Sequence, residues 1–210
     1  ANPLPGTVGG YPEWRFLNHA CEPNTMLRGR VLVARRRGVD IQQRGSGNIG
    51  ATNVARVLGK APALLVLLLD AGKAAVPTYL ALWGGQPQAV VAAVAFAAIV
   101  GHCFSPWLRF RGGKGVACAI GVYLVISPTF SAIVIGAFVA VLAVTRVPAL
   151  GSAVGVWVMA VLLTLYRSPP LAALGLATAA LILFTHRSNW RHLLARRAAG
   201  PGGEPAPPAA

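Results

Sequence analysis

Residues 45–56 form the stretch of this chain whose residue types are best suited to binding chemistry. The sequence GSGNIGATNVAR combines three glycines with Ser46, two asparagines and Thr52, and it ends in Arg56. Glycine lets backbone N–H groups approach a ligand closely, while short polar side chains and an arginine add hydrogen-bond donors. No carboxylate occurs between positions 45 and 60. The pattern predicts an anion site, above all for phosphate, and the alternative is an ordinary glycine-rich turn before a helix.

A second polar cluster, SPWLRFRGGKGVA at residues 105–117, places Arg109, Arg111 and Lys114 among closely spaced glycines. Its GGKG sequence matches a nucleotide-binding P-loop only in part. The first glycine of that motif is missing, and Lys114 is followed by glycine instead of Ser or Thr. We therefore exclude nucleotide binding through this motif. We expect a second turn that binds phosphate, with Lys114 supplying a point charge.

A third polar cluster, THRSNWRHLLARR at residues 185–197, follows the last apolar segment and contains His186. Because the three clusters contain no Asp or Glu, His102 and His186 are the titratable candidates for a general base. The residues alone leave other roles open, since His186 could cap the end of a membrane span and His102 could be structural.

The composition is typical of a membrane protein. Of the 210 residues, 55% are hydrophobic and only 11% are charged, and 19 Lys and Arg oppose 5 Asp and Glu. Soluble domains carry about 25% charged residues, and nucleic-acid-binding proteins are rarely this apolar, so the excess of basic residues indicates a basic cytoplasmic face. Three cysteines without metal-type spacing are expected to be free thiols, with neither a disulfide framework nor a zinc site.

The hydropathy pattern predicts an all-α integral membrane protein, a polytopic helical bundle with six spans. The expected spans are residues 61–83, 87–104, two within 115–144 separated by Ser127-Pro128, 148–166 and 170–185. Asp70 and Lys73 lie three residues apart on one face of the first span, so we expect an ion pair inside the bundle, with direct substrate contact as the alternative.

The whole chain is expected to divide into three parts. Residues 1–26 are expected to be an irregular leader, and residues 198–210 a disordered Gly/Pro/Ala tail. The membrane domain is residues 27–197, and it opens with a basic segment, 27–44, that is expected to meet anionic lipid, with a run of solvated charges as the alternative. With six spans, nearly all loop charge falls on one side, as the positive-inside rule requires. The three polar clusters also fall on that side and can converge there.

These three clusters, in this order and spacing, resemble the bacterial acyl-phosphate:glycerol-3-phosphate acyltransferase family (PlsY type). The first motif is matched by residues 45–53 and Arg56, and the family's Asp-x-x-Lys by Asp70 and Lys73. The second and third motifs are matched by Gly101-His102, Phe104, Pro106, Phe110 and residues 112–116, and by His186-Arg187 and Asn189. The resemblance covers roughly residues 38–194.

The resemblance implies transfer of a fatty acyl group from acyl phosphate to the 1-position of glycerol 3-phosphate, giving lysophosphatidate and phosphate. It implies seven transmembrane helices in the bacterial inner membrane, an active site open to the cytoplasm, and neither cofactor nor metal. The implied partners are the two substrates, membrane lipid and an upstream enzyme that makes acyl phosphate, with no nucleic acid.

The resemblance and the residue types together predict the site residues. We predict that the catalytic residues are Ser46, Arg56, Lys114 and His186. The predicted substrate-binding residues are Gly47, Asn48, Thr52, Asn53, Gly112, Gly113, Gly115 and Asn189. In this hypothesis a phosphate oxygen takes the proton of the attacking hydroxyl, and His186 orients the glycerol 3-phosphate.

The chain departs from the family pattern at three places. Residues 1–37 hold no apolar span where the family has its first helix, Ala149 stands where a serine is usual, and Arg196-Arg197-Ala198 replaces a Gly-x-Glu. The missing first helix favours one alternative to the acyltransferase, an inactive or regulatory membrane relative. The second alternative is a transporter in which the same basic loops line a path for organophosphate or other anions. A transporter would need polar residues deep within several spans, and only Asp70 and Lys73 qualify.

Overall fold

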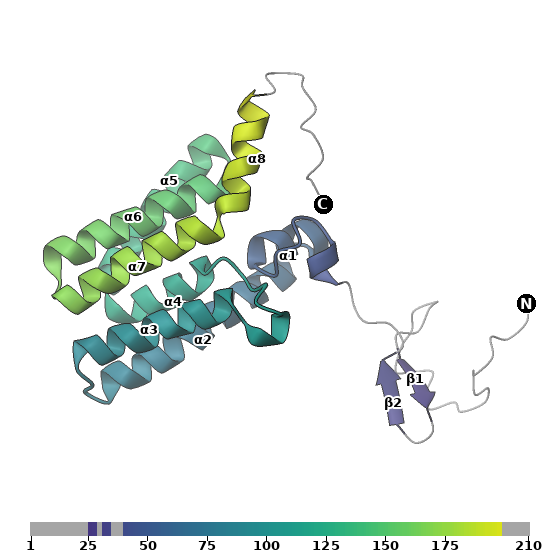
Figure 1. Ribbon diagram of the computed structural model, residues 1–210, viewed down its shortest axis with the longest axis horizontal. Coiled ribbons are helices and arrows are strands. Elements are labelled where there is room, and N and C mark those ends of the chain that lie inside the picture. Colours follow the sequence, from purple (N-terminus) through teal and green to yellow (C-terminus); the bar gives the residue numbers. More distant parts are fainter. Residues whose placement is uncertain (1–24, 29–30, 35–39, 199–210) are drawn as a thin grey trace, which may run out of the picture. The chain divides into compact units, whose positions relative to one another are not determined.

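The computed structural model describes residues 25–28, 31–34 and 40–198 (Figure 1). The chain divides into two compact units, Ala1–Gly47 and Asn48–Ala210. The boundary lies inside the first polar cluster, whereas the sequence placed the start of the membrane domain at residue 27. Most of the expected irregular leader and nearly all of the expected disordered tail lie outside the described residues.

The described part of the first unit contains a pair of antiparallel strands, β1 (Thr25–Arg28) and β2 (Val31–Ala34), and a short 3-10 helix, η2 (Ile41–Gln43). The strands are an exception to the all-α prediction, and β1 begins inside the segment that we expected to be irregular. β-Branched Val31 and Val33 favour extended backbone, which explains the strand without any long apolar alternation. Asp40 begins η2, because its carboxylate accepts a hydrogen bond from the backbone N–H of Gln42 at 3.0 Å.

The described part of the second unit is helical, as predicted. Its helices are α1 (Ala51–Leu58), α2 (Lys60–Trp83), α3 (Gln88–Cys103), η3 (Pro106–Leu108), α4 (Val116–Ile126), α5 (Pro128–Thr145), α6 (Pro148–Tyr166), α7 (Pro169–Thr185) and α8 (Arg187–Ala198). Proline at the first helical position starts α5, α6 and α7, where its missing N–H costs no intrahelical bond. The predicted break at Ser127-Pro128 is confirmed.

All six predicted spans are helices, but not all are long enough to cross a bilayer. By length and composition, the described residues contain four spanning helices, at Lys60–Trp83, Gln88–Leu108, Pro128–Thr145 and Pro148–Tyr166. A fifth results if α7 and α8, which meet at 54°, are counted as one bent span. The six predicted spans exceed these four or five because α4 has only 11 residues, whereas α7, with 17 residues, is at the lower limit for a spanning helix.

The helices of the second unit pack in two groups, α2 with α3 and α4, and α5 with α6 and α7, joined where α3 contacts α7 (Figure 1). Small residues permit the closest approaches. A methyl group on Gly121 of α4 would overlap the backbone carbonyl of Ala71 in α2, so only glycine allows this packing. Between the groups, Ile99, Met159 and Ile182 form part of a fully buried apolar core.

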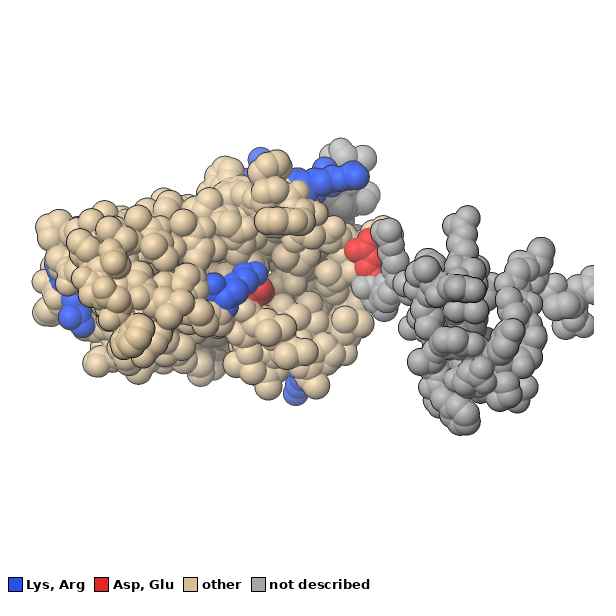
Figure 2. Space-filling model, turned by 90° about the horizontal axis from the view of Figure 1, so that it is seen from below, with Lys and Arg blue, Asp and Glu red and all other residues tan. Residues whose placement is uncertain are grey.

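The outer surface of the bundle is apolar, as a lipid-facing surface must be. Only 6% of the 18-residue helix α5 is buried inside the protein. Figure 2 shows one face on which uncharged surface predominates and Lys and Arg atoms occur in isolated groups. The α3–α4 loop, α1 and α8 lie together at one end of this unit (Figure 1). The second and third polar clusters are therefore close in space, as the predicted topology required.

Candidate active site

Two of the three polar clusters are joined by direct hydrogen bonds through Lys114. The ammonium group of Lys114 donates to the side-chain oxygen of Asn189 in the first turn of α8, at 2.6 Å. The hydroxyl of Thr185, the last residue of α7, donates to the backbone carbonyl of Lys114 at 2.9 Å. Both the backbone and the side chain of Lys114 are thus held by residues more than 70 positions away.

Arg56 on α1 is the residue of the first cluster whose charge acts on Lys114. Burial lowers the pKa of Lys114, and the positive charge of Arg56 lowers it further. Because the charge of Arg56 acts on Lys114, and the side-chain partner of Lys114 is the neutral amide of Asn189, these residues form a site of net positive charge. Thr52 is exposed one helical turn before Arg56 and therefore lies on the same face of α1. This arrangement suits a multiply charged anion such as a phosphate monoester.

His186 lies at the junction of α7 and α8 and is 4% exposed. Its Nδ1 lies 2.8 Å from the backbone carbonyl of Ile182. A carbonyl can only accept, so Nδ1 carries the proton, and Nε2 of the neutral ring is left as an acceptor. The charge of Lys114 acts on this ring. His186 can therefore accept a hydrogen bond from a substrate hydroxyl near the positive site.

Asn48 and Asn53 shape the entry into α1. The side-chain oxygen of Asn48 accepts from the N–H of Gly50, and the amide of Asn53 donates to the backbone carbonyl of Asn48, each at 2.9 Å. Asn53 is only 2% exposed. These contacts fix the loop and the start of the helix that carries Arg56. They give both asparagines a positioning role that their prediction as substrate-binding residues did not include.

Ser46 and Gly47 belong to the first unit, whereas Lys114 belongs to the second. Gly47 has φ +69° and donates its N–H to the carbonyl of Arg44 at 3.0 Å. A side chain at this position would be strained and would meet the carbonyl of Gln42 at 2.9 Å. Glycine is therefore required here by the turn, and the roles of Ser46 and Gly47 toward substrate stay predictions.

The glycines of the second cluster pack against α3. The N–H groups of Gly112 and Gly113 donate to the carbonyls of Cys103 and His102, at 3.1 and 3.2 Å. A methyl group on either glycine would overlap the end of α3, and one on Gly115 would lie 3.0 Å from the Cys103 sulfur. We expected these amides to bind phosphate, but those of Gly112 and Gly113 are already used. The glycines permit close packing of the loop, and the roles of Gly112, Gly113, Gly115 and Lys114 toward substrate stay predictions.

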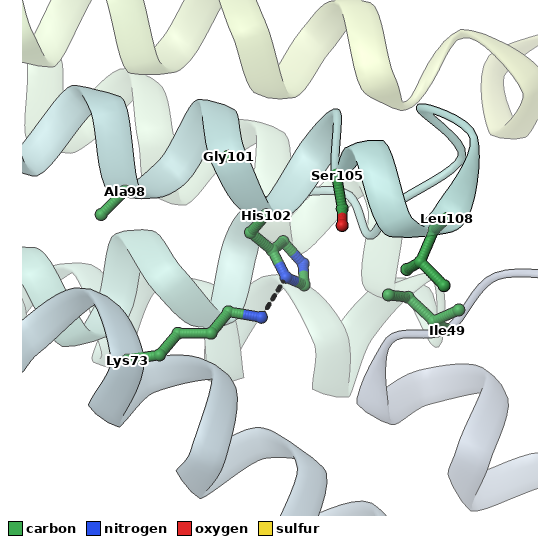
Figure 3. A pocket seen from close by; sticks show the side chains of 7 residues that line it. All are labelled: Ile49, Lys73, Ala98, Gly101, His102, Ser105 and Leu108. Carbon is green, nitrogen blue, oxygen red and sulfur yellow. Dashed lines mark hydrogen bonds between the residues drawn. The ribbon is translucent and has the colours of Figure 1, made fainter.

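A polar group that the sequence revealed only in part lies beside this loop. The predicted ion pair is confirmed, because the Lys73 ammonium lies 2.6 Å from Oδ1 of Asp70. The same ammonium lies 2.6 Å from Nδ1 of His102, for which the sequence left open a role as general base and a structural role (Figure 3). Lys73 and His102 line a pocket of about 360 Å³ together with Ile49, Ala98, Gly101, Ser105 and Leu108. Because Lys73 and His102 are 29 positions apart in the chain, no local sequence pattern indicated this contact.

Two further expectations can be compared with the structure. Cys103 and Cys118 are buried free thiols, as predicted, and Cys21 lies outside the described residues. Ala149, at the start of α6, is buried and brings no hydroxyl to the site. The nearby hydroxyl of Ser152 donates to the Pro148 carbonyl of its own helix at 3.0 Å.

The chain is similar to known glycerol-3-phosphate acyltransferases over most of its length. The family model of that description matches residues 26–196. The glycerol-3-phosphate acyltransferase of Anaeromyxobacter sp. (strain Fw109-5) is 46% identical over 178 residues, covering 82% of this chain and 86% of the relative. That of Myxococcus xanthus (strain DK1622) is 46% identical over 171 residues, covering 80% and 88%.

A solved structure gives the same result. The glycerol 3-phosphate form of PlsY (YgiH), an integral membrane glycerol 3-phosphate acyltransferase, is 32% identical, with a TM-score of 0.73, over 76% of this chain and 81% of that chain. Its lysophosphatidic acid form has a TM-score of 0.69, over 73% and 79%. Sequence and helical fold therefore agree, and the chain belongs to the glycerol-3-phosphate acyltransferase family.

Proposed function

We propose that this protein transfers a fatty acyl group from acyl phosphate to the 1-position of glycerol 3-phosphate, giving lysophosphatidate and inorganic phosphate. The observation that carries the proposal is the convergence of Arg56, Lys114, His186 and Asn189 at one end of the helical bundle of a family member. Both substrates carry phosphate, so a site with two adjacent cations and no carboxylate partner suits them.

The proposed reaction needs positioning more than activation, because acyl phosphate is already a reactive acyl donor. The glycerol hydroxyl attacks the acyl carbonyl carbon, a new C–O ester bond forms, and the bond from that carbon to the phosphate oxygen breaks. The bonding electrons leave with the phosphate, and a phosphate oxygen takes the hydroxyl proton. Arg56 and Lys114 stabilise the charge that collects on the leaving phosphate.

His186 orients the attacking hydroxyl in this proposal. Its Nε2 is the acceptor left by the bond from Nδ1 to Ile182, so it can hold the hydroxyl hydrogen in the direction of attack. Asn189, one turn of helix further on, is bound to Lys114 and therefore connects hydroxyl orientation with phosphate binding. The oxygen of Ser46 and the hydroxyl of Thr52 are proposed as further phosphate contacts.

We place the protein in a bacterial cytoplasmic membrane with this site facing the cytoplasm. The support is the charge distribution: the loops around Lys60, Arg109 and Arg146 and the helix α8 carry most of the described basic residues, and they share one side of the predicted topology. On that side the protein can take up glycerol 3-phosphate from water and acyl phosphate from lipid. An enzyme that makes acyl phosphate is the proposed source of the donor.

The experiment that tests this function uses the purified full chain in detergent, with glycerol 3-phosphate and palmitoyl phosphate. Phosphate release and lysophosphatidate are measured together, and palmitoyl-CoA is the parallel donor. We expect product from palmitoyl phosphate alone, lost in Lys114→Ala and retained in the matched control Lys60→Ala, whose exposed side chain begins α2. Product from palmitoyl-CoA alone would show that acyl phosphate is not the acyl donor. A folded protein with no product from either donor would support an inactive relative.

A further inference from the structure

The group formed by Asp70, Lys73 and His102 has an unusual position for charged residues. Asp70 is the only Asp or Glu between positions 48 and 203, and it lies within a spanning helix. Its side chain is 12% exposed and that of His102 is 3% exposed, whereas that of Lys73 is 46% exposed beside the pocket (Figure 3). Charged groups in such a segment are costly, so their retention calls for a role.

The hydrogen bonds fix the state of the His102 ring. The Lys73 ammonium can only donate, so Nδ1 of His102 accepts, and the neutral ring carries its proton on Nε2. Asp70 balances the charge of Lys73 at 2.6 Å and lies 3.5 Å from the same Nδ1. The sulfur of Cys118 in α4 donates to the backbone carbonyl of Asp70 at 3.1 Å, which ties the group to a third helix. The ring therefore has one preferred orientation.

His102 contacts the lysine loop in two ways. Its backbone carbonyl accepts the N–H of Gly113 at 3.2 Å. Its ring fills the space where a side chain at position 113 would stand, since a methyl group there would overlap Nε2 and its neighbouring carbons. Gly113 is buried and immediately precedes Lys114. The backbone immediately before Lys114 therefore packs against the His102 ring.

We propose that Asp70, Lys73 and His102 are positioning residues that set the location of the Lys114 ammonium group through the contact of the His102 ring with Gly113. This inference rests on the proposed function, in which Lys114 binds substrate phosphate. Thr185 and Asn189 hold Lys114 from the side of α7 and α8. The polar group holds it from the side of α2 and α3, so phosphate affinity depends on residues that never contact phosphate.

The test is a double-mutant cycle on glycerol 3-phosphate binding, measured by titration calorimetry with the full chain in detergent. His102→Phe keeps a ring against Gly113 but removes the acceptor that orients it. We expect this change to raise the Kd about fivefold to tenfold in the wild-type background. In the Lys114→Ala background the same change should alter the Kd by less than about twofold, because the group it acts through is gone.

Lys73→Met provides a second variant that should behave in the same way, in case His102→Phe does not fold. Thr78→Val is the matched control, because Thr78 is buried on α2 but bonds only to the Ala74 carbonyl of its own helix. The positioning role would be overturned if each variant changed the Kd by the same factor in the wild-type and Lys114→Ala backgrounds. It would also be overturned if neither variant changed the Kd in either background. If Lys114→Ala itself leaves the Kd unchanged, the phosphate-binding role proposed for Lys114 is wrong, and the inference falls with it.

Discussion

Lys73 and Lys114 are both held by hydrogen bonds of 2.6 Å, but their partners differ in charge. Lys73 lies beside the carboxylate of Asp70 and a neutral histidine, so its charge is balanced within the protein. Lys114 donates to the neutral amide of Asn189 and lies near the cation Arg56. A balanced ammonium stabilises structure, whereas an unbalanced one attracts an external anion. The difference supports the proposals that Lys73 is a positioning residue and that Lys114 binds substrate.

The largest expected difference between the two lysines is in catalysis. Lys114→Met should lower kcat/KM by about a hundredfold to a thousandfold, because it removes charge stabilisation in the transition state. Lys73→Met should lower kcat/KM by only about tenfold, because it acts through the position of Lys114. Steady-state assays with palmitoyl phosphate and glycerol 3-phosphate measure both values. A larger loss for Lys73→Met than for Lys114→Met would reverse the two assignments.

The contact between the two regions can be changed directly at Gly113. Gly113→Ala introduces a methyl group where the His102 ring stands, so ring or loop must move and Lys114 must shift. We expect a loss of about tenfold or more in kcat/KM, since small displacements of catalytic groups are costly. The matched control is Gly136→Ala in α5, because a methyl group there has no neighbour within 4 Å. Comparable losses in the two variants would argue against a specific contact.

The charge balance around Lys73 predicts an effect on stability. Lys73→Met leaves the Asp70 carboxylate without its closest cation in a spanning helix, and we expect the free energy of unfolding to fall by about 1–3 kcal/mol. The double variant Asp70→Asn/Lys73→Met should recover at least half of that loss, because it leaves no unpaired charge. Unfolding in mixed micelles, followed by tryptophan fluorescence, compares the variants. A double variant as unstable as the single one would mean that packing of the Lys73 stem, and not its charge, stabilises the bundle.

The same comparison shows what could be predicted from sequence. Apolar length and prolines predicted the helices α2 to α7, and the spacing of Asp70 and Lys73 predicted their ion pair. These are local properties, so the sequence carries them directly. The contact of Lys73 with His102 depends on how two helices pack, and the overlap of His102 with Gly113 depends on how a loop folds back. Neither follows from residue types alone.

The number of spans was overestimated for a related reason. Hydropathy marks the 11-residue helix α4 as apolar, but it does not show that α4 is packed closely against α2 through Gly121. A short helix buried among others and a spanning helix have similar composition, and only length and packing separate them. The paired strands β1 and β2 were missed because two four-residue strands give a weak alternation signal.

The smallest expected effect concerns the pH dependence of the unbalanced lysine. Burial and the charge of Arg56 lower the pKa of Lys114 below the ordinary lysine value of 10.5. Phosphate binding needs the ammonium form, so kcat/KM should fall as pH rises through this lowered pKa. The free energy of unfolding should instead rise with pH between the lowered pKa and 10.5, because in that window the unfolded chain holds the proton and the folded chain does not.

Arg56→Gln removes one cause of the lowered Lys114 pKa and should move the alkaline limb of kcat/KM to higher pH. Arg146→Gln, in the turn before α6, is the matched control. A limb that moves equally in both variants would mean that net charge, and not the neighbour of Lys114, sets its pKa.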